Sequence, residues 1–536
     1  MGSNTQVKAG RAEGARIARA AGLVSAMTLV SRVLGLIREV VFAALLGAGY
    51  HSDAFRIGFR IPNLLRDLFA EGALSAAFVP VYTRTQKEGG RESAFLLANR
   101  VLTLLAVLLG ALVVVAIVFA WPLVSALAPG FDDVPGKAEL TILLTRVMMA
   151  FLPLVSFAAV AMGMLNAEER FGIPALSPAL FNVVAILWAV VLWSLGLPLD
   201  QVVIGWALGT LLGGVAQFAV QVPSLRRLGW RFRPEWAPRD PGLVRMAKLM
   251  APATVGLAAV QVNIFVSSRF ASHEPGAVSW LDYAFRLLYL PIGLFGVALG
   301  TIATAGLARR AAEGDMEGLR NTLRQSLSML AYLTVPATVG LMVLRVPVVR
   351  LLYERGRFTG ADTQATAAAL FLYSFGLVGY TGVKVLAPAF YALGKPRVPL
   401  LASVLAVATN LLIIFAFNRV LGFRAIALGT ALGSLVNAGL LLALFERRVG
   451  GLFGQGLFRP VARMSVAAGG MGALAWLAAA GLERQLGTNG LRAQLLTGLV
   501  PVAVGAFAYA LLTRALRVGE AEVLWRMVRE RLVRKT

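Results

Sequence analysis

Arginines stand at intervals inside apolar stretches of this chain, and their type and spacing suit the binding of a phosphate-bearing anion. Arg32 and Arg38 lie in one apolar run, and Arg56, Arg60 and Arg66 lie in the next. The planar guanidinium group donates two parallel hydrogen bonds to a phosphate. An arginine inside a bilayer is costly, so it usually faces a wet cavity and marks a functional site. These residues therefore predict a cationic cavity in a membrane protein.

Polar residues of the second run share one face of the predicted helix. They recur three or four residues apart, at Arg56, Arg60, Asn63, Asp67 and Glu71. Side chains at this spacing project from the same side of an α-helix. A later run places Asp282 and Arg286 four residues apart, with Ser279 just before them as a further cavity candidate.

The same residues allow a second interpretation, in which internal ion pairs hold the helices together. The acids that would pair with the arginines are Glu39, Asp53, Asp67, Glu71 and Asp282. Pairing would neutralise most of the positive charge, so the sequence leaves an anion site and a structural role open. In the first case Asp53, Asp67 and Glu71 would act as counter-ions or gating groups of the cavity.

The composition predicts a membrane protein and excludes several classes. Of 536 residues, 58% are hydrophobic and 15% charged, with a mean hydropathy of +0.75. The net charge is +24, but its basic residues form no continuous stripe, so we expect no nucleic-acid partner. With no cysteine and two histidines, we expect no catalytic residues, metal site or cofactor.

Apolar runs long enough to cross a bilayer recur along the whole chain. A membrane-spanning helix needs about 20 such residues, and this template fits about fourteen runs. Their expected positions are 21–47, 53–82, 94–128, 140–165, 174–197, 201–223, 242–270, 277–308, 322–344, 362–393, 397–418, 423–446, 460–482 and 493–515. The charged residues 520–535 predict an interfacial amphipathic helix.

Lysine and arginine are unevenly distributed between the predicted loops. Most fall on the side of the N-terminus, which by the positive-inside rule makes both termini cytoplasmic. One group departs from this bias, because the predicted topology places it outside: Arg345, Arg350, Arg355 and Arg357.

An internal repeat relates the two halves of the chain. The segment from Asp53 to Arg56, followed by Pro62, is similar to the segment from Asp282 to Arg286, followed by Pro291. An even number of predicted spans separates corresponding segments, so the halves share one orientation. This is a parallel repeat about an axis normal to the membrane, as in some transporters.

The run 31–82 resembles the N-terminal signature of the MurJ/MviN family of lipid II flippases. The motifs that carry the resemblance are SRVLG, GAG followed by SDAF, PNLLR and FAEGALSAAFVP, and a second match covers 278–301. The resemblance implies an all-α polytopic fold with two six-helix lobes in a V and two C-terminal helices. The lobes would be 1–223 and 224–446, followed by a lipid-tail groove at 447–518 and a cytoplasmic amphipathic tail at 519–536.

The resemblance also implies a substrate and its site. The substrate would be lipid II, an undecaprenyl-pyrophosphate-linked disaccharide-pentapeptide, moved by alternating access across the bacterial cytoplasmic (inner) membrane. The family motifs map its binding residues onto Arg32, Arg38, Arg66 and Arg286. Family members carry a sodium site with acids in the seventh and eleventh spans, but 242–270 and 397–418 contain no Asp or Glu. Asn410 remains in the eleventh span as a partial ligand, but it is not enough for a site. We therefore predict no sodium site.

The expected partners are lipid II, membrane lipids and the peptidoglycan synthesis machinery, and we expect a monomer. The alternative function is a flippase for another polyprenyl-pyrophosphate-linked oligosaccharide. A multidrug exporter of the same fold is disfavoured, since cationic substrates need an acidic cavity. A membrane glycosyltransferase is disfavoured as well, because the predicted loops are too short for a catalytic domain.

Overall fold

The computed structural model describes residues 2–66, 73–452, 456, 458–522 and 525, in which every regular element is a helix. The chain divides into two compact units, Met1–Gln261 and Val262–Thr536. The boundary falls inside α10 (Pro241–Ala271), which begins in the first unit and ends in the second. The predicted domain boundaries after 223, 446 and 518 stay predictions.

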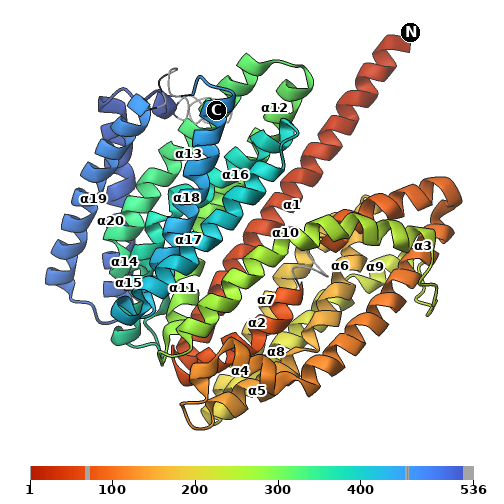
Figure 1. Cartoon of the computed structure of the whole chain (residues 1–536), viewed down its shortest axis with the longest axis horizontal. Helices are drawn as coiled ribbons and strands as arrows, with labels where there is room; N and C mark the ends of the chain where they lie inside the picture. The colour runs from red at the N-terminus through yellow and green to blue at the C-terminus, as the bar shows by residue number, and fades with distance from the viewer. Residues whose placement is uncertain (1, 67–72, 453–455, 457, 523–524, 526–536) are drawn as a thin grey trace. The chain divides into compact units, whose positions relative to one another are not determined.

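The first unit is a helical bundle around an apolar core. Its described helices are α1 (Gly2–Leu46), α2 (Tyr50–Arg66), α3 (Ala73–Val118), α4 (Ala120–Leu127), η2 (Pro129–Phe131), α5 (Lys137–Met148), α6 (Phe151–Ala167), α7 (Gly172–Ser194), α8 (Leu199–Ala219), α9 (Val222–Arg227) and the start of α10. Helix α3 packs on α6, α2 packs on α5, and α7 packs on both α1 and α8 (Figure 1). A Cβ on Gly163 of α6 would lie 2.7 Å from the Phe78 ring of α3, so glycine permits this close approach.

The second unit has a similar construction with two further helices at its end. After the end of α10 its described elements are α11 (Ala277–Pro291), the π-helix η3 (Ile292–Val297), α12 (Ala298–Ala312), α13 (Met316–Val343), α14 (Arg345–Tyr353), α15 (Gly360–Phe375), α16 (Leu377–Ala392), α17 (Arg397–Leu421), α18 (Arg424–Arg448), α19 (Phe458–Leu486) and α20 (Leu491–Ala515). Helices α17 and α18 pair along their lengths, as do α19 and α20, and α13 packs against α19.

Several predicted spans are interrupted helices. Left-handed Gly90, with φ 78°, breaks α3, and the predicted fourth span is two helices joined near Ala150. Pro291, which lacks the N–H of an α-helical hydrogen bond, is followed by the six-residue π-helix η3. The predicted tenth span is divided at Gly376, where a Cβ would lie 2.7 Å from the Ala431 backbone.

The predicted class of all-α polytopic membrane protein is confirmed. Among the described residues, eleven helical stretches are long and apolar enough to cross a membrane. Helices α1 and α10 occupy the positions expected for the first and seventh spans. The predicted second span differs, since α2 ends at Arg66 and α3 begins at Ala73. The V-shaped arrangement stays a prediction, and the amphipathic segment 520–535 falls mostly outside the described residues.

Packing within each unit agrees with the predicted internal repeat. Helix α2 packs on α5 in the first unit, and α11 packs on α15 in the second. In the first unit Asn182 of α7 donates a hydrogen bond to the Ser31 carbonyl of α1. In the second, Asn410 of α17 donates to the side-chain oxygen of Asn263 in α10. The same type of residue thus joins corresponding helices in both halves.

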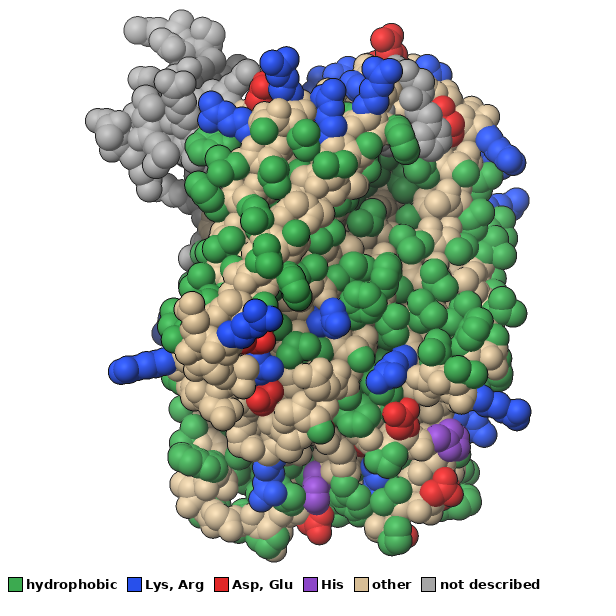
Figure 2. Space-filling model, turned by 90° about the vertical axis from the view of Figure 1, so that its left-hand side faces the viewer, with side chains coloured by type: hydrophobic (Ala, Val, Ile, Leu, Met, Phe, Trp, Pro, Cys, Tyr) green, Lys and Arg blue, Asp and Glu red, His purple; other side chains and the backbone are tan. Residues whose placement is uncertain are grey.

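The molecular surface is strongly apolar. Figure 2 shows a face on which hydrophobic side chains predominate and many Lys and Arg side chains gather toward one end. Helices α19 and α20 contribute exposed Val466, Leu474, Leu499 and Phe507. Apolar exposure of this extent is typical of a surface that contacts lipid rather than water.

Candidate functional site

Two predicted cavity arginines of the first unit meet at one carboxylate. Glu39 of α1 is buried, and its Oε1 lies 2.8 Å from Nη2 of Arg38. Its Oε2 lies 3.6 Å from Nη2 of Arg56 in α2. The cluster of Arg38, Glu39 and Arg56 therefore carries one net positive charge. Sequence reasoning treated Glu39 only as one of several acids, because its bridging role depends on how α1 packs beside α2.

Aromatic rings support both arginines of this cluster. The Cζ atom of Arg56 lies 5.0 Å from the ring centroid of Phe42, and that of Arg38 lies 5.2 Å from the ring centroid of Phe181. The Arg56 side chain is only 5% exposed, whereas that of Arg38 is 21% exposed. Cation–π contacts hold a guanidinium in place while leaving hydrogen-bond donors at its edge. Arg38 is therefore the more accessible of the two to an incoming anion.

The remaining predicted residues of the first unit differ in accessibility. Arg60, Asn63 and Arg66 are partly buried along α2, while Arg32 is exposed on α1. Asp67 and Glu71 lie outside the described residues, so their predicted counter-ion role stays a prediction. Of the predicted set, the structure brings together Arg38 and Arg56 through Glu39.

Asp53 takes part in a buried ion pair. Nζ of Lys137, at the start of α5, lies 3.0 Å from Oδ2 of Asp53, and both side chains are at most 2% exposed. The ammonium also lies 4.1 Å from the ring centroid of Phe131. This pair joins α2 to α5. Sequence reasoning placed Asp53 at the cavity and did not find Lys137, because the partners are 84 residues apart.

Arg286 of the second unit also pairs with an acid. Its Nε donates a 2.7 Å hydrogen bond to Oδ2 of Asp282, one turn earlier in α11. The Arg286 side chain is 39% exposed, so a ligand can reach it. Ser279 is fully buried on the same helix. The predicted Asp282–Arg286 proximity is present, whereas a cavity shared with the arginines of the first unit stays a prediction.

Side-chain amides occupy the seventh and eleventh spans, where the family resemblance placed the acids of a sodium site. The amide nitrogen of Asn410 donates to Oδ1 of Asn263, and Thr430 of α18 donates to Oδ1 of Asn410 over 3.4 Å. Among the described residues no group of three or more His, Cys, Asp or Glu side chains gathers to hold a metal ion.

The sequence is similar to one protein family and to curated proteins of that family. Residues 42–526 match the family model described as lipid II flippase MurJ. A probable lipid II flippase MurJ from Vibrio cholerae is 35% identical over 94% of this chain and 97% of its own length. A lipid II flippase MurJ from Burkholderia cenocepacia is 35% identical over 82% of this chain and 85% of its own.

Solved structures agree at the level of the fold. A lipid II flippase MurJ in an inward closed conformation aligns with a TM-score of 0.74 and 24% identity, over 92% of this chain and 99% of that one. An inward-facing multidrug resistance MATE family transporter of the MOP superfamily aligns with a TM-score of 0.64 and 17% identity, over 81% of this chain and 99% of that one. At these identities the similarity concerns the fold.

Proposed function

Because the chain belongs to the MurJ family of lipid II flippases, we propose that it carries lipid II across the cytoplasmic membrane by alternating access. The family consists of transporters, so the polar residues are expected to bind and release a ligand rather than to perform a reaction. The movement proceeds from the inner to the outer leaflet, and the membrane-spanning chain has both termini in the cytoplasm.

The observation that carries this proposal is the cluster of Arg38, Glu39 and Arg56. A pyrophosphate that enters a membrane-embedded site loses hydration, and guanidinium groups replace the lost water with charge-assisted hydrogen bonds. Arg38 is aligned by Phe181 and keeps part of its side chain exposed. Glu39 competes with the ligand for both arginines, which limits how tightly the pyrophosphate binds and so permits its release.

Other residues complete the proposed binding site. Arg32, Arg66 and Arg286 contact the head group, and Arg60, Asn63 and Ser279 line the cavity. Arg286 exchanges its bond to Asp282 for a bond to the phosphate. Asp67 and Glu71 act as counter-ions. The polyprenyl tail stays in lipid and follows α19 and α20, whose exposed apolar side chains suit it. The protein works as a monomer alongside the peptidoglycan synthesis machinery.

A complementation experiment tests the function. Bacteria depleted of their own lipid II flippase receive this chain, and we expect growth and cell shape to recover. Arg38→Ala and Arg286→Ala should lose rescue at a normal protein level. Lysine at either site should restore little, because it supplies charge without the planar fork. The matched control is Arg419→Ala, which removes an exposed arginine at the end of α17 and should rescue fully.

Two outcomes would contradict the proposal. If Arg38→Ala and Arg286→Ala both rescue as well as the original chain, these arginines do not bind the pyrophosphate. If the chain inserts into the membrane but never rescues, while it moves another polyprenyl-pyrophosphate oligosaccharide in vesicles, the substrate is not lipid II.

A further inference from the structure

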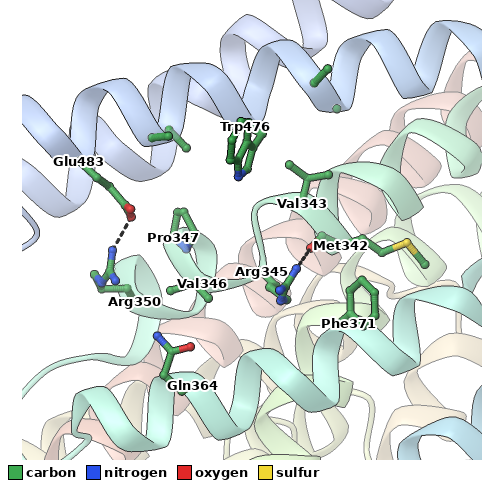
Figure 3. Close-up of a pocket in the computed structure, with 14 residues that line it drawn as sticks. Met342, Val343, Arg345, Val346, Pro347, Arg350, Gln364, Phe371, Trp476 and Glu483 are labelled. Atoms are coloured by element: carbon green, nitrogen blue, oxygen red, sulfur yellow. Dashed lines mark hydrogen bonds and ion pairs between the residues drawn. The ribbon is translucent and has the colours of Figure 1, made fainter.

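A pocket of about 590 Å³ lies in the second unit among α13, α14, α15 and α19 (Figure 3), and its lining includes none of the proposed substrate-binding residues. Its apolar wall includes Met342, Val343, Phe371 and Trp476, and its polar lining consists of Arg345, Arg350, Gln364 and Glu483. Arg345 and Arg350 belong to the arginine group that departs from the charge bias of the predicted topology. The proposed function uses α19 as part of the path of the polyprenyl tail but gives the charged residues of this pocket no role.

Arg345 is held in place by groups that leave its charge uncompensated. Its Nη1 donates a 2.7 Å hydrogen bond to the carbonyl oxygen of Met342, and its Cζ atom lies 4.8 Å from the ring centroid of Phe371. Among the described residues no carboxylate forms an ion pair with it. A guanidinium fixed on one side by a ring and a carbonyl still has donors for an anion on the other.

Arg350 contrasts with Arg345, because two acids surround it. Its Nη1 lies 2.6 Å from Oε1 of Glu483 in α19, and its Nε lies 3.7 Å from Oε2 of Glu354. Both acids thus lie at Arg350, and among the described residues neither forms an ion pair with Arg345, which keeps its positive charge. The ion pair between Arg350 and Glu483 joins α14 to α19 at the polar end of the pocket.

The pocket is elongated, with Arg350 beside Glu483 and Arg345 beside the apolar residues Met342 and Phe371. It follows α19 from Glu483 to Gly472, which at about 1.5 Å per helical residue is roughly 16 Å. Gln364 extends into it from α15 near the two arginines, and Trp476 points into it from α19 (Figure 3). On α19 the wall beyond Trp476 is formed by Ala473 and Gly472. A guanidinium set among apolar walls matches a lipid whose head group is anionic and whose chain is apolar.

We propose that this pocket binds a membrane phospholipid, with the phosphate of its head group on Arg345 and an acyl chain along Trp476 and Phe371. The site is separate from the proposed flippase function and does not depend on it. If both termini lie in the cytoplasm, as proposed above, the pocket faces the outer leaflet. A bound anionic lipid would then explain why Arg345 and Arg350 lie on the outer side, against the charge bias of the other predicted loops.

The test measures lipid binding to the purified full chain in detergent by native mass spectrometry. The probe is phosphatidylglycerol, and diacylglycerol serves as the equivalent lipid without phosphate. We expect Arg345→Gln to weaken the tightest phosphatidylglycerol binding roughly tenfold, the effect of losing a charge-assisted hydrogen bond. The matched control is Arg424→Gln, which removes an exposed arginine that also lies against a ring, that of Phe423, and should change nothing.

A second variant and a competition experiment complete the test. Ala473→Phe fills the pocket while keeping its charges, and we expect it to weaken phosphatidylglycerol binding as strongly as Arg345→Gln does. Glycerol 3-phosphate at equal concentration should not displace the lipid, because it lacks the chain. The proposal is overturned if Arg345→Gln or Ala473→Phe binds the lipid as the original chain does. It is also overturned if diacylglycerol binds equally well, or if glycerol 3-phosphate competes fully, which would indicate a site for soluble phosphate.

Discussion

At the scale of single residues, the ion pair of Asp53 and Lys137 can be tested by its energetics. Both charges are buried, so removing one partner takes away the ion pair that offsets the cost of burying the other charge. We expect Asp53→Asn or Lys137→Met alone to lower the free energy of unfolding by about 3–5 kcal/mol. The double variant should lose less than the sum of the two, since it leaves no charge behind. Denaturant unfolding of the purified chain measures all three.

This double variant also separates two roles of Asp53. If the carboxylate only joins α2 to α5, the double variant should restore rescue in depleted cells as well as stability. A stable double variant that fails to rescue would show that Asp53 also acts in transport. The control is Arg84→Gln, which breaks an exposed pair with Glu88 and should change stability by less than about 1 kcal/mol.

At the scale of helices, the start of α13 depends on a cap. Asp315, which lies between two candidate membrane-spanning stretches, accepts a 2.8 Å hydrogen bond from the Gly318 amide and pairs with Arg310. The Gly318 bond and the nearby arginine lower the pKa of Asp315 below its usual value. Because the folded pKa is lowered, this stabilisation is present above the unfolded pKa and is lost as pH falls through the folded one.

Hydrogen exchange at Gly318 measures this cap. We expect Asp315→Ala to reduce the protection of the Gly318 amide severalfold at pH 7 and to have little effect below the folded pKa of Asp315. Asp315→Asn keeps an oxygen acceptor without the titration, so it should retain most of the protection at every pH. Equal protection in Asp315→Ala and the original chain at pH 7 would show that the cap is unimportant.

The sequence predicted the positions of the helices well, but it predicted their interruptions and most of their contacts poorly. Apolar runs report where a helix crosses the membrane, and α17, α18, α19 and α20 begin and end close to their predicted positions. Gly376 and Ala150 carry no distinct signal in such runs, since glycine and alanine are abundant throughout. The Asp282–Arg286 pair was predictable because both residues share one helix face. The contact of Arg56 with Glu39 needed the packing of α1 on α2.

At the scale of the whole molecule, the repeat explains which features recur and which diverge. Asn182 and Asn410 form hydrogen bonds between corresponding helices of the two units. The buried Asp53–Lys137 ion pair, in contrast, is replaced by a different contact in the second unit. There the Trp280 indole of α11 donates a 2.9 Å hydrogen bond to Asp362 of α15. Related helix pairs are thus joined by an ion pair in one half and by a neutral donor in the other.

The energy source for transport is also a property of the whole molecule. The hydrogen bonds of the Asn410 amide indicate whether sodium could be that source. A sodium ion requires several oxygen ligands, usually with a carboxylate among them. Here the Asn410 amide nitrogen, a donor, is directed at Asn263, and its oxygen accepts from Thr430. A cation entering this position would meet a donor and would have to break both bonds. We therefore expect transport to continue when potassium replaces sodium.

We predict that the membrane potential supplies direction in place of sodium. The pyrophosphate head group is negative and moves outward, and a potential that is positive outside contributes roughly 2.3 kcal/mol per charge per 100 mV. We expect lipid II exposure at the outer leaflet to fall when the potential is collapsed and to persist when sodium is removed at constant potential. Asn410→Leu, which removes both bonds, is the control and should leave the sodium response flat. Loss of exposure on sodium removal alone would contradict this account, and the Asn410, Asn263 and Thr430 side chains would then be the ligands to examine.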